Sequence, residues 1–138
     1  MLFPKKIKYR KWQTGRKNLK TVSPDTRGTT LAFGAFGLKA ITAGRIRANQ
    51  IEAARKAIAR LTTKGGKMWL RIFPDRPYTA KPAEVGMGKG KGAPMGYLAE
   101  IRPGRIIFEI DGLVPEVARE ALTKAGAKLP VKTRVVSR

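Results

Sequence analysis

Apolar residues recur at three- and four-residue spacing along residues 45–61, which is the pattern of an amphipathic helix. The apolar stripe is formed by Ile51, Ala54, Ile58 and Leu61. Charged and polar side chains occupy most of the positions between them. The start is ambiguous by about a turn, at Arg45 or Arg47, because Asn49 and Glu52 have the spacing of a capping box.

A second apolar stripe predicts a helix that starts near Pro115, since proline suits the first helical position. Its buried face is expected to consist of Ala118, Ala121, Leu122, Ala125 and Leu129. Acidic side chains lie early in this segment and lysines lie late, as the helix dipole favours. Pro130 is expected to stop the helix.

Alternating or β-branched runs predict strands on either side of these helices. The expected strands are residues 29–41, 67–73, 97–102, 105–110 and 131–136. The glycines at 34 and 37 of the first strand indicate either bulges or a place where another backbone comes close. The runs at residues 97–102 and 105–110 flank Pro103-Gly104, which predicts an antiparallel hairpin. Pro-Gly nevertheless favours a type II turn over the primed turns that hairpins prefer.

Strands with two interspersed helices predict an α+β fold, a two-layer domain in which both helices cover one face of a mostly antiparallel sheet. We expect a basic N-terminal arm over residues 1–28 and a single domain over residues 29–138. The domain would carry a flexible glycine and lysine loop at residues 85–95.

Charge narrows the class of partner. The 138 residues include 30 Lys and Arg against 9 Asp and Glu, a net charge of +21. Such a charge repels itself unless counterions or a polyanion neutralise it, which makes nucleic acid the leading partner. A non-specific cation for nucleic acid or membrane surfaces is the main alternative, since charge alone would suffice for it.

The absence of His and Cys removes imidazole catalysis, thiol nucleophiles, disulfides and the usual zinc ligands. The nine carboxylates are scattered and no pair stands out as catalytic. We therefore expect no enzyme, no catalytic or metal-binding residue and no cofactor. The first 20 residues are not a secretory signal and no run is long enough to cross a bilayer, so an intracellular, soluble protein is expected.

Cations with few acids nearby are the candidate RNA contacts. The first 50 residues hold twelve Lys and Arg against Asp25 alone. Arginines suit bidentate phosphate contacts and base stacking better than lysines do. The rings of Phe3, Tyr9 and Trp12 either stack on bases or pack back onto the domain, and the sequence favours neither. The candidates are Lys5, Lys6, Lys8, Arg10, Lys11, Trp12, Arg16, Lys17, Lys39, Arg45, Arg47, Arg55, Arg60 and Arg71.

Residues 86–92, with the sequence GMGKGKG, form a loop that gives up packing for flexibility and carries bare ammonium groups. A phosphate loop needs Ser or Thr after Gly-Lys and then a helix, and a dinucleotide fingerprint also needs a helix, whereas Ala93-Pro94 follow here. A loop that reaches into a polyanion is therefore favoured. A solvated hairpin tip without function is the alternative.

Several strings together resemble the bacterial large-subunit ribosomal protein L-sixteen. They are residues 1–11 (MLFPKKIKYRK), 33–40 (FGAFGLKA), 50–55 (QIEAAR), 66–75 (GKMWLRIFPD), 87–92 (MGKGKG) and 128–133 (KLPVKT). The resemblance covers nearly the whole chain. Two positions depart from the family pattern: Gly86 stands where an arginine is usual, and Arg47 where threonine is frequent.

The resemblance implies a non-catalytic α+β protein of the large subunit, located in cytoplasmic ribosomes. It would bind the large ribosomal RNA near the base of the central protuberance and help organise the aminoacyl-tRNA site. Its partners would be that RNA, tRNA in the A site with the P site as a further option, and other large-subunit proteins. Neither a membrane nor a small-molecule substrate is implied. The tRNA contacts would come from Met87, Lys89 and Lys91.

Overall fold

The computed structural model describes residues 1–15, 18–62 and 65–138. The elements are β1 (Phe36–Ala40), β2 (Gly44–Arg47), α1 (Ala48–Leu61), β3 (Lys67–Leu70), β4 (Arg76–Ala80), β5 (Ala93–Ile101), β6 (Ile106–Asp111), α2 (Pro115–Gly126) and β7 (Thr133–Ser137). This confirms the α+β class and both helices. Within the described ranges, no helix has the length and apolar character that a membrane crossing requires.

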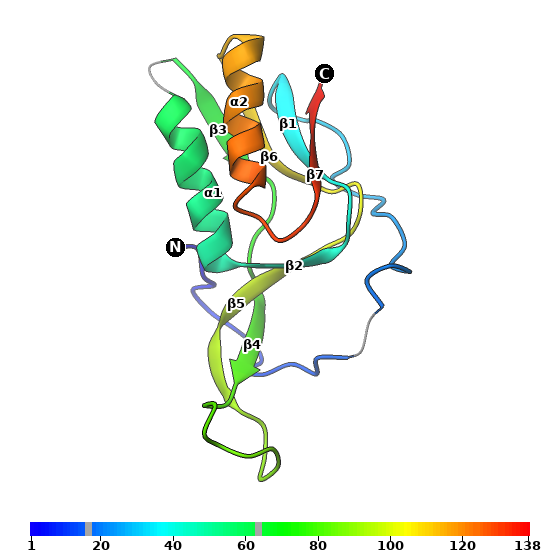
Figure 1. Cartoon of the computed structure of the whole chain (residues 1–138), viewed down its shortest axis with the longest axis vertical. Coiled ribbons are helices and arrows are strands. Elements are labelled where there is room, and N and C mark those ends of the chain that lie inside the picture. Colours follow the sequence, from blue (N-terminus) through cyan, green and yellow to red (C-terminus); the bar gives the residue numbers. More distant parts are fainter. Residues whose placement is uncertain (16–17, 63–64) are drawn as a thin grey trace.

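The strands form two antiparallel sheets, one with the order β3-β6-β1-β7 and one with the order β2-β5-β4. Helices α1 and α2 lie side by side at one end of the molecule, and the β4–β5 ribbon extends from the other end (Figure 1). Helix α2 contacts β1, β6 and β7 of the four-stranded sheet, whereas α1 contacts β2 and β5 of the three-stranded sheet. The N-terminal arm passes the ribbon before the chain enters β1 (Figure 1). The molecule is therefore a helix-covered body with a projecting ribbon.

The core lies between the two helices and the sheets. Both predicted apolar faces are buried there, with Leu61 partly buried at the edge. On α1 the fully buried side chains are Ile51, Ala54 and Ile58. On α2 they are Ala118, Ala121, Leu122 and Ala125, and Leu129 is buried just beyond the helix end. Strand β6 supplies Phe108 and Ile110 from the sheet side.

Helix α1 begins one residue after the later predicted start. Arg47 is the N-cap residue, and its backbone N–H donates to Oε1 of Gln50 over 2.9 Å. The predicted capping box of Asn49 and Glu52 is therefore wrong. Glu52 instead pairs with Arg55 one turn further along the helix. Residues 44–47 extend as β2 because they pair with β5 and bury Ile46.

The predicted hairpin around Pro103-Gly104 is also wrong, although both of its strands exist. Strand β5 pairs with β2 and β4, whereas β6 pairs with β1 and β3. Gly104 has φ +96, and the N–H of Arg105 donates to the carbonyl of Arg102 over 3.3 Å, as in a type II turn. That turn does not match the twist of paired strands, so β5 and β6 diverge into different sheets.

Two further strand predictions need correction. Only residues 36–40 of the expected 29–41 form a strand, because the N–H groups of residues 32–34 bind the carboxylate of Glu109 instead of a neighbouring strand. Strand β4, which follows Pro74, was not predicted. It tolerates Pro77 because it is the edge strand of its sheet, where a missing N–H removes no necessary bond.

Candidate nucleic-acid interface

The β4–β5 ribbon carries a glycine-lysine loop, which we define as residues 81–92. The pairing of Ala80 with Ala93 closes its base. At its tip Gly88, Lys89 and Gly90 all have positive φ, +102, +59 and +99. The side chain of Met87 is 97% exposed, and Lys89 and Lys91 are exposed as well. The loop thus presents cations and one thioether away from the body.

A crossing segment of the arm, residues 11–14, lies against this ribbon. The guanidinium of Arg76 donates from Nη2 to the carbonyls of Gln13 (3.0 Å) and Thr14 (2.8 Å). Nη2 of Arg45 donates to the same Thr14 carbonyl over 3.1 Å. The carbon of the Arg76 guanidinium also lies 5.7 Å from the ring centroid of Trp12. Two arginines thereby hold an irregular segment in one place.

Lysines join the crossing segment to the glycine-lysine loop. Nζ of Lys91 donates to the carbonyl of Trp12, and Nζ of Lys11 donates to the carbonyl of Lys91 over 3.3 Å. At the loop base, Nζ of Lys81 donates to the carbonyl of Gly88. Lys81 and Lys91 of the loop are thus both engaged in hydrogen bonds. Within the described residues, Lys89 at the exposed tip is the lysine of this loop that makes no such bond.

Most of the predicted RNA contacts of the arm are exposed. Lys5, Lys6, Lys8 and Arg10 lie on its surface. The rings of Phe3 and Tyr9 are 64% and 60% exposed, so neither packs back onto the domain. Nζ of Lys8 lies 5.4 Å from the ring centroid of Tyr9. Arg16 and Lys17 lie outside the described residues.

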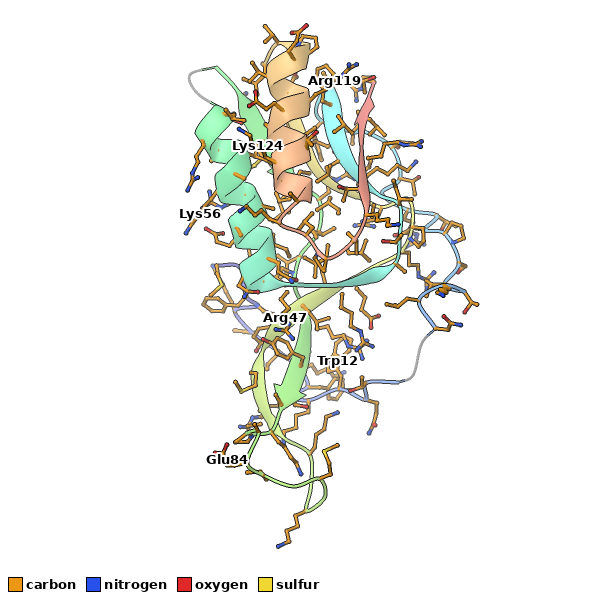
Figure 2. The ribbon with its side chains drawn as sticks, in the orientation of Figure 1. Trp12, Arg47, Lys56, Glu84, Arg119 and Lys124 are labelled. Carbon is orange, nitrogen blue, oxygen red and sulfur yellow. The ribbon has the colours of Figure 1, made fainter. Side chains whose placement is uncertain are left out.

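On the body, Arg47 and Arg60 are exposed and Lys39 is half-buried. Arg47 ends β2, where its guanidinium carbon lies 5.2 Å from the ring centroid of Tyr78, and Figure 2 shows it beside the β4–β5 ribbon with Trp12 nearby. The arm, the ribbon and β2 therefore bring cations and aromatic rings together at one end of the molecule.

The remaining predicted arginines, Arg45, Arg55 and Arg71, have carboxylate partners within the chain. Nε of Arg45 lies 3.3 Å from Glu100, which Arg76 also contacts. Arg55 pairs with Glu52, and the hydrogen bond from Arg55 lowers the pKa of that carboxyl. The same bond raises the pKa of Arg55. Any RNA contact of these arginines must share the guanidinium with a partner already present.

Arg71 has the most buried of these partners. Glu109 is fully buried, and its Oε2 accepts a 2.5 Å hydrogen bond from Nη1 of Arg71. Its Oε1 accepts backbone N–H groups from Ala32 (2.9 Å), Phe33 (3.0 Å) and Gly34 (3.1 Å). Burial alone would raise the pKa of Glu109, but these hydrogen bonds outweigh it and hold the pKa below its ordinary value.

Arg76 is the important residue that sequence reasoning missed. It lies on the unpredicted strand β4, is 9% exposed and contacts Glu100, Trp12 and two arm carbonyls. Its position between Pro74 and Pro77 masked the strand. The sequence offers one chemical signal for the role of Arg76. A guanidinium group in a strand needs hydrogen-bond acceptors, and the carboxylate of Glu100 on a neighbouring strand is such an acceptor.

Comparison with protein families finds a match over nearly the full length. The model of a family described as ribosomal protein L16p/L10e matches residues 4–136. The matched region includes the crossing segment, both helices, both sheets and the glycine-lysine loop.

Proposed function

The chain belongs to the ribosomal protein L16p/L10e family, and on that premise we propose that its glycine-lysine loop contacts tRNA while its arm anchors it in ribosomal RNA. As a member of this family it is a structural, RNA-binding protein of the large ribosomal subunit, acts in translation and is located with the ribosome in the cytoplasm. Its partners include ribosomal RNA and other ribosomal proteins. The proposal places the loop at the aminoacyl-tRNA site, with A-site tRNA as its first partner and P-site tRNA as a second.

One observation carries the tRNA proposal: the glycine-lysine loop projects from the ribbon at the end opposite the helices (Figure 1). Its tip holds Lys89 in a left-handed conformation, which a residue other than glycine rarely adopts. Met87 beside it is almost fully exposed. A loop of this kind contributes nothing to the core, and exposed ammonium groups on it favour a phosphate backbone.

The anchoring proposal rests on the arm. Its exposed cations follow one another along residues 5–10, and the exposed rings of Phe3 and Tyr9 can stack on unpaired bases. The hydrogen bonds from Arg76 and Arg45 to the crossing segment fix where the arm leaves the body. The exposed Arg47 and Arg60 would add phosphate contacts from the body.

Replacing Lys89 with Ala, alone and together with Lys91→Ala, tests the tRNA contact. Large subunits with Lys89→Ala should form at normal yield, because Lys89 makes no contact with the core. The double variant also loses the hydrogen bond from Lys91 to the carbonyl of Trp12, but Arg76 and Arg45 still hold the crossing segment, so its yield should stay close to normal. Their affinity for A-site tRNA should fall several-fold, and the difference from wild type should shrink as salt is raised. The double variant Lys124→Ala with Lys128→Ala is the matched control. Lys124 lies on α2, far from the loop (Figure 2), and Lys128 follows two residues after the end of that helix.

Filter binding of tRNA to purified subunits over a range of salt concentrations is the measurement. Equal tRNA affinity of the Lys89→Ala and wild-type subunits at low salt would contradict the proposed contact. A loss of affinity of the same size in the α2 control would show that total charge, and not the loop, sets the affinity.

A further inference from the structure

A small hollow of about 130 Å³ lies where the crossing segment meets the ribbon. Its walls include Trp12 and Thr14 from the arm, Arg45 from β2, and Arg76, Tyr78 and Thr79 from β4. We call it the aromatic hollow. Trp12, at its arm side, is 43% exposed, so the hollow opens to solvent beside the exposed cations of the arm.

The walls of the aromatic hollow are fixed before any ligand arrives. Arg76 is held by Glu100 and by two arm carbonyls, and it lies against the Trp12 ring. Arg45 is held by Glu100 and by the carbonyl of Thr14. Binding here would therefore cost little side-chain ordering.

The size of the hollow matches a single planar ring system. A cavity of about 150 Å³ lined by apolar side chains holds one benzene molecule, and a water molecule takes up about 30 Å³. The 130 Å³ here suits a ring of comparable area and leaves no room for a sugar and phosphate as well. A bound nucleotide would thus have to leave its backbone outside, along the basic arm.

The chemistry of the walls favours a base over an anion. The carboxylate of Glu100 neutralises one of the two positive charges of Arg45 and Arg76, so the hollow attracts phosphate less than two unpaired arginines would. Indole and phenol rings and planar guanidinium groups are surfaces on which bases stack. The hydroxyl groups of Thr14 and Thr79 can hydrogen-bond to the edge of a base.

We propose that the aromatic hollow receives one unpaired, extruded nucleobase of the RNA that the chain binds. This inference rests on the RNA-binding role given above and goes beyond it by naming a subsite that binds one nucleobase. The phosphates of that nucleotide's backbone would meet exposed cations: Arg47, which lies against the ring of Tyr78, and Lys8 and Arg10, which precede Trp12 in the arm. The base comes from ribosomal RNA or from tRNA, and the two sources are separable by experiment.

The test compares large subunits that carry Trp12→Ala, Trp12→Phe or Tyr78→Ala with wild type, using base-specific chemical probing of the RNA in the presence and absence of tRNA. Tyr9→Ala is the matched control, because Tyr9 is an exposed arm ring outside the hollow. The chain-to-subunit ratio is measured in each preparation. This ratio reports on RNA binding itself and separates a failure of the subsite from a failure of the proposed function.

One nucleotide should become several-fold more reactive in Trp12→Ala and Tyr78→Ala subunits at an unchanged chain-to-subunit ratio. Trp12→Phe keeps a ring and should stay close to wild type, as should Tyr9→Ala. If the nucleotide that becomes more reactive is found in subunits without tRNA, the bound base comes from ribosomal RNA. If it is found only in the tRNA, the bound base comes from tRNA. Ultraviolet cross-linking of wild-type subunits should join the same base to the peptide containing Trp12 or Tyr78. Unchanged reactivity in Trp12→Ala and Tyr78→Ala subunits, with the chain present and no such cross-link, would overturn the subsite.

Discussion

Glu109 shows how a charged residue can hold an RNA-binding fold together from inside. Its carboxylate is fully buried, yet it accepts three backbone N–H groups and pairs with Arg71. The guanidinium carbon of Arg71 lies 5.2 Å from the ring centroid of Phe33, which stacks on Trp69 at 5.8 Å. One acid therefore ties residues 32–34 to β6 and to the end of β3.

Glu109→Gln should lower the free energy of unfolding of the isolated full-length chain by about 3 kcal/mol at pH 7, because it leaves a largely buried Arg71 without its counter-charge. The pKa of Glu109 is depressed in the folded state, so its contribution is complete above the ordinary value of 4.5 and is lost as pH falls through the lower folded value. Wild type should thus lose stability below about pH 4.5, and the gap to Glu109→Gln should close there.

Urea unfolding at several pH values measures both effects. Glu52→Gln is the control, since its pair with Arg55 is a partly exposed pair within one helix and should lower the unfolding midpoint much less than loss of the buried pair does. A Glu109→Gln midpoint equal to that of wild type at pH 7 would show that the buried pair does not stabilise the fold.

Among the elements, those set by local pattern were predictable and those set by long-range pairing were not. Both helices follow from apolar spacing, and Pro115 marks the start of α2. Local spacing does not encode which strands pair with one another. It therefore could not predict that β5 and β6 enter different sheets, or that β2 and β4 form as strands. At the site, exposed cations such as Lys89 were predictable from composition. The role of Arg76 was not, because it depends on the crossing segment.

The β4–β5 ribbon depends on a glycine at the base of its loop. A Cβ added to Gly92 would lie 2.7 Å from the carbonyl oxygen of Ala80, a backbone atom of the paired strand, so one strand must shift. Gly92→Ala should destabilise the ribbon by about 1–3 kcal/mol, as overpacking does. Amide exchange in β4 and β5 should rise in consequence, without matching changes in α1 and α2.

Gly86→Ala is the control for that experiment, because nothing lies within 4 Å of the added Cβ and Gly86 has no positive φ. Its exchange pattern should match that of wild type. Ribbon protection in Gly92→Ala equal to that in Gly86→Ala would show that the loop base tolerates a side chain.

At the scale of the whole molecule, the chain separates a neutralised interior from a cationic exterior. The net charge is +21, and several of the few acids are used in pairs such as Glu109 with Arg71 and Glu100 with Arg45. The cations of the arm from Lys5 to Arg10 and those at the loop tip are exposed, and the loop projects from the end opposite the helices (Figure 1). A polyanion bound there would relieve their repulsion. If the chain bound RNA only through non-specific charge, the binding would be weak and would be lost at modest salt.

Sucrose-gradient sedimentation of ribosomes at moderate and high salt tests the central claim most directly. The wild-type chain should co-migrate with the large subunit at both salt concentrations. The variant Lys5→Glu, Lys8→Glu, Arg10→Glu should incorporate several-fold less, whereas the charge-matched control Arg119→Glu, Lys128→Glu, Lys132→Glu should incorporate as wild type does. Release of the wild-type chain at modest salt, or equal incorporation of the arm variant and the control, would contradict an RNA anchor in the arm.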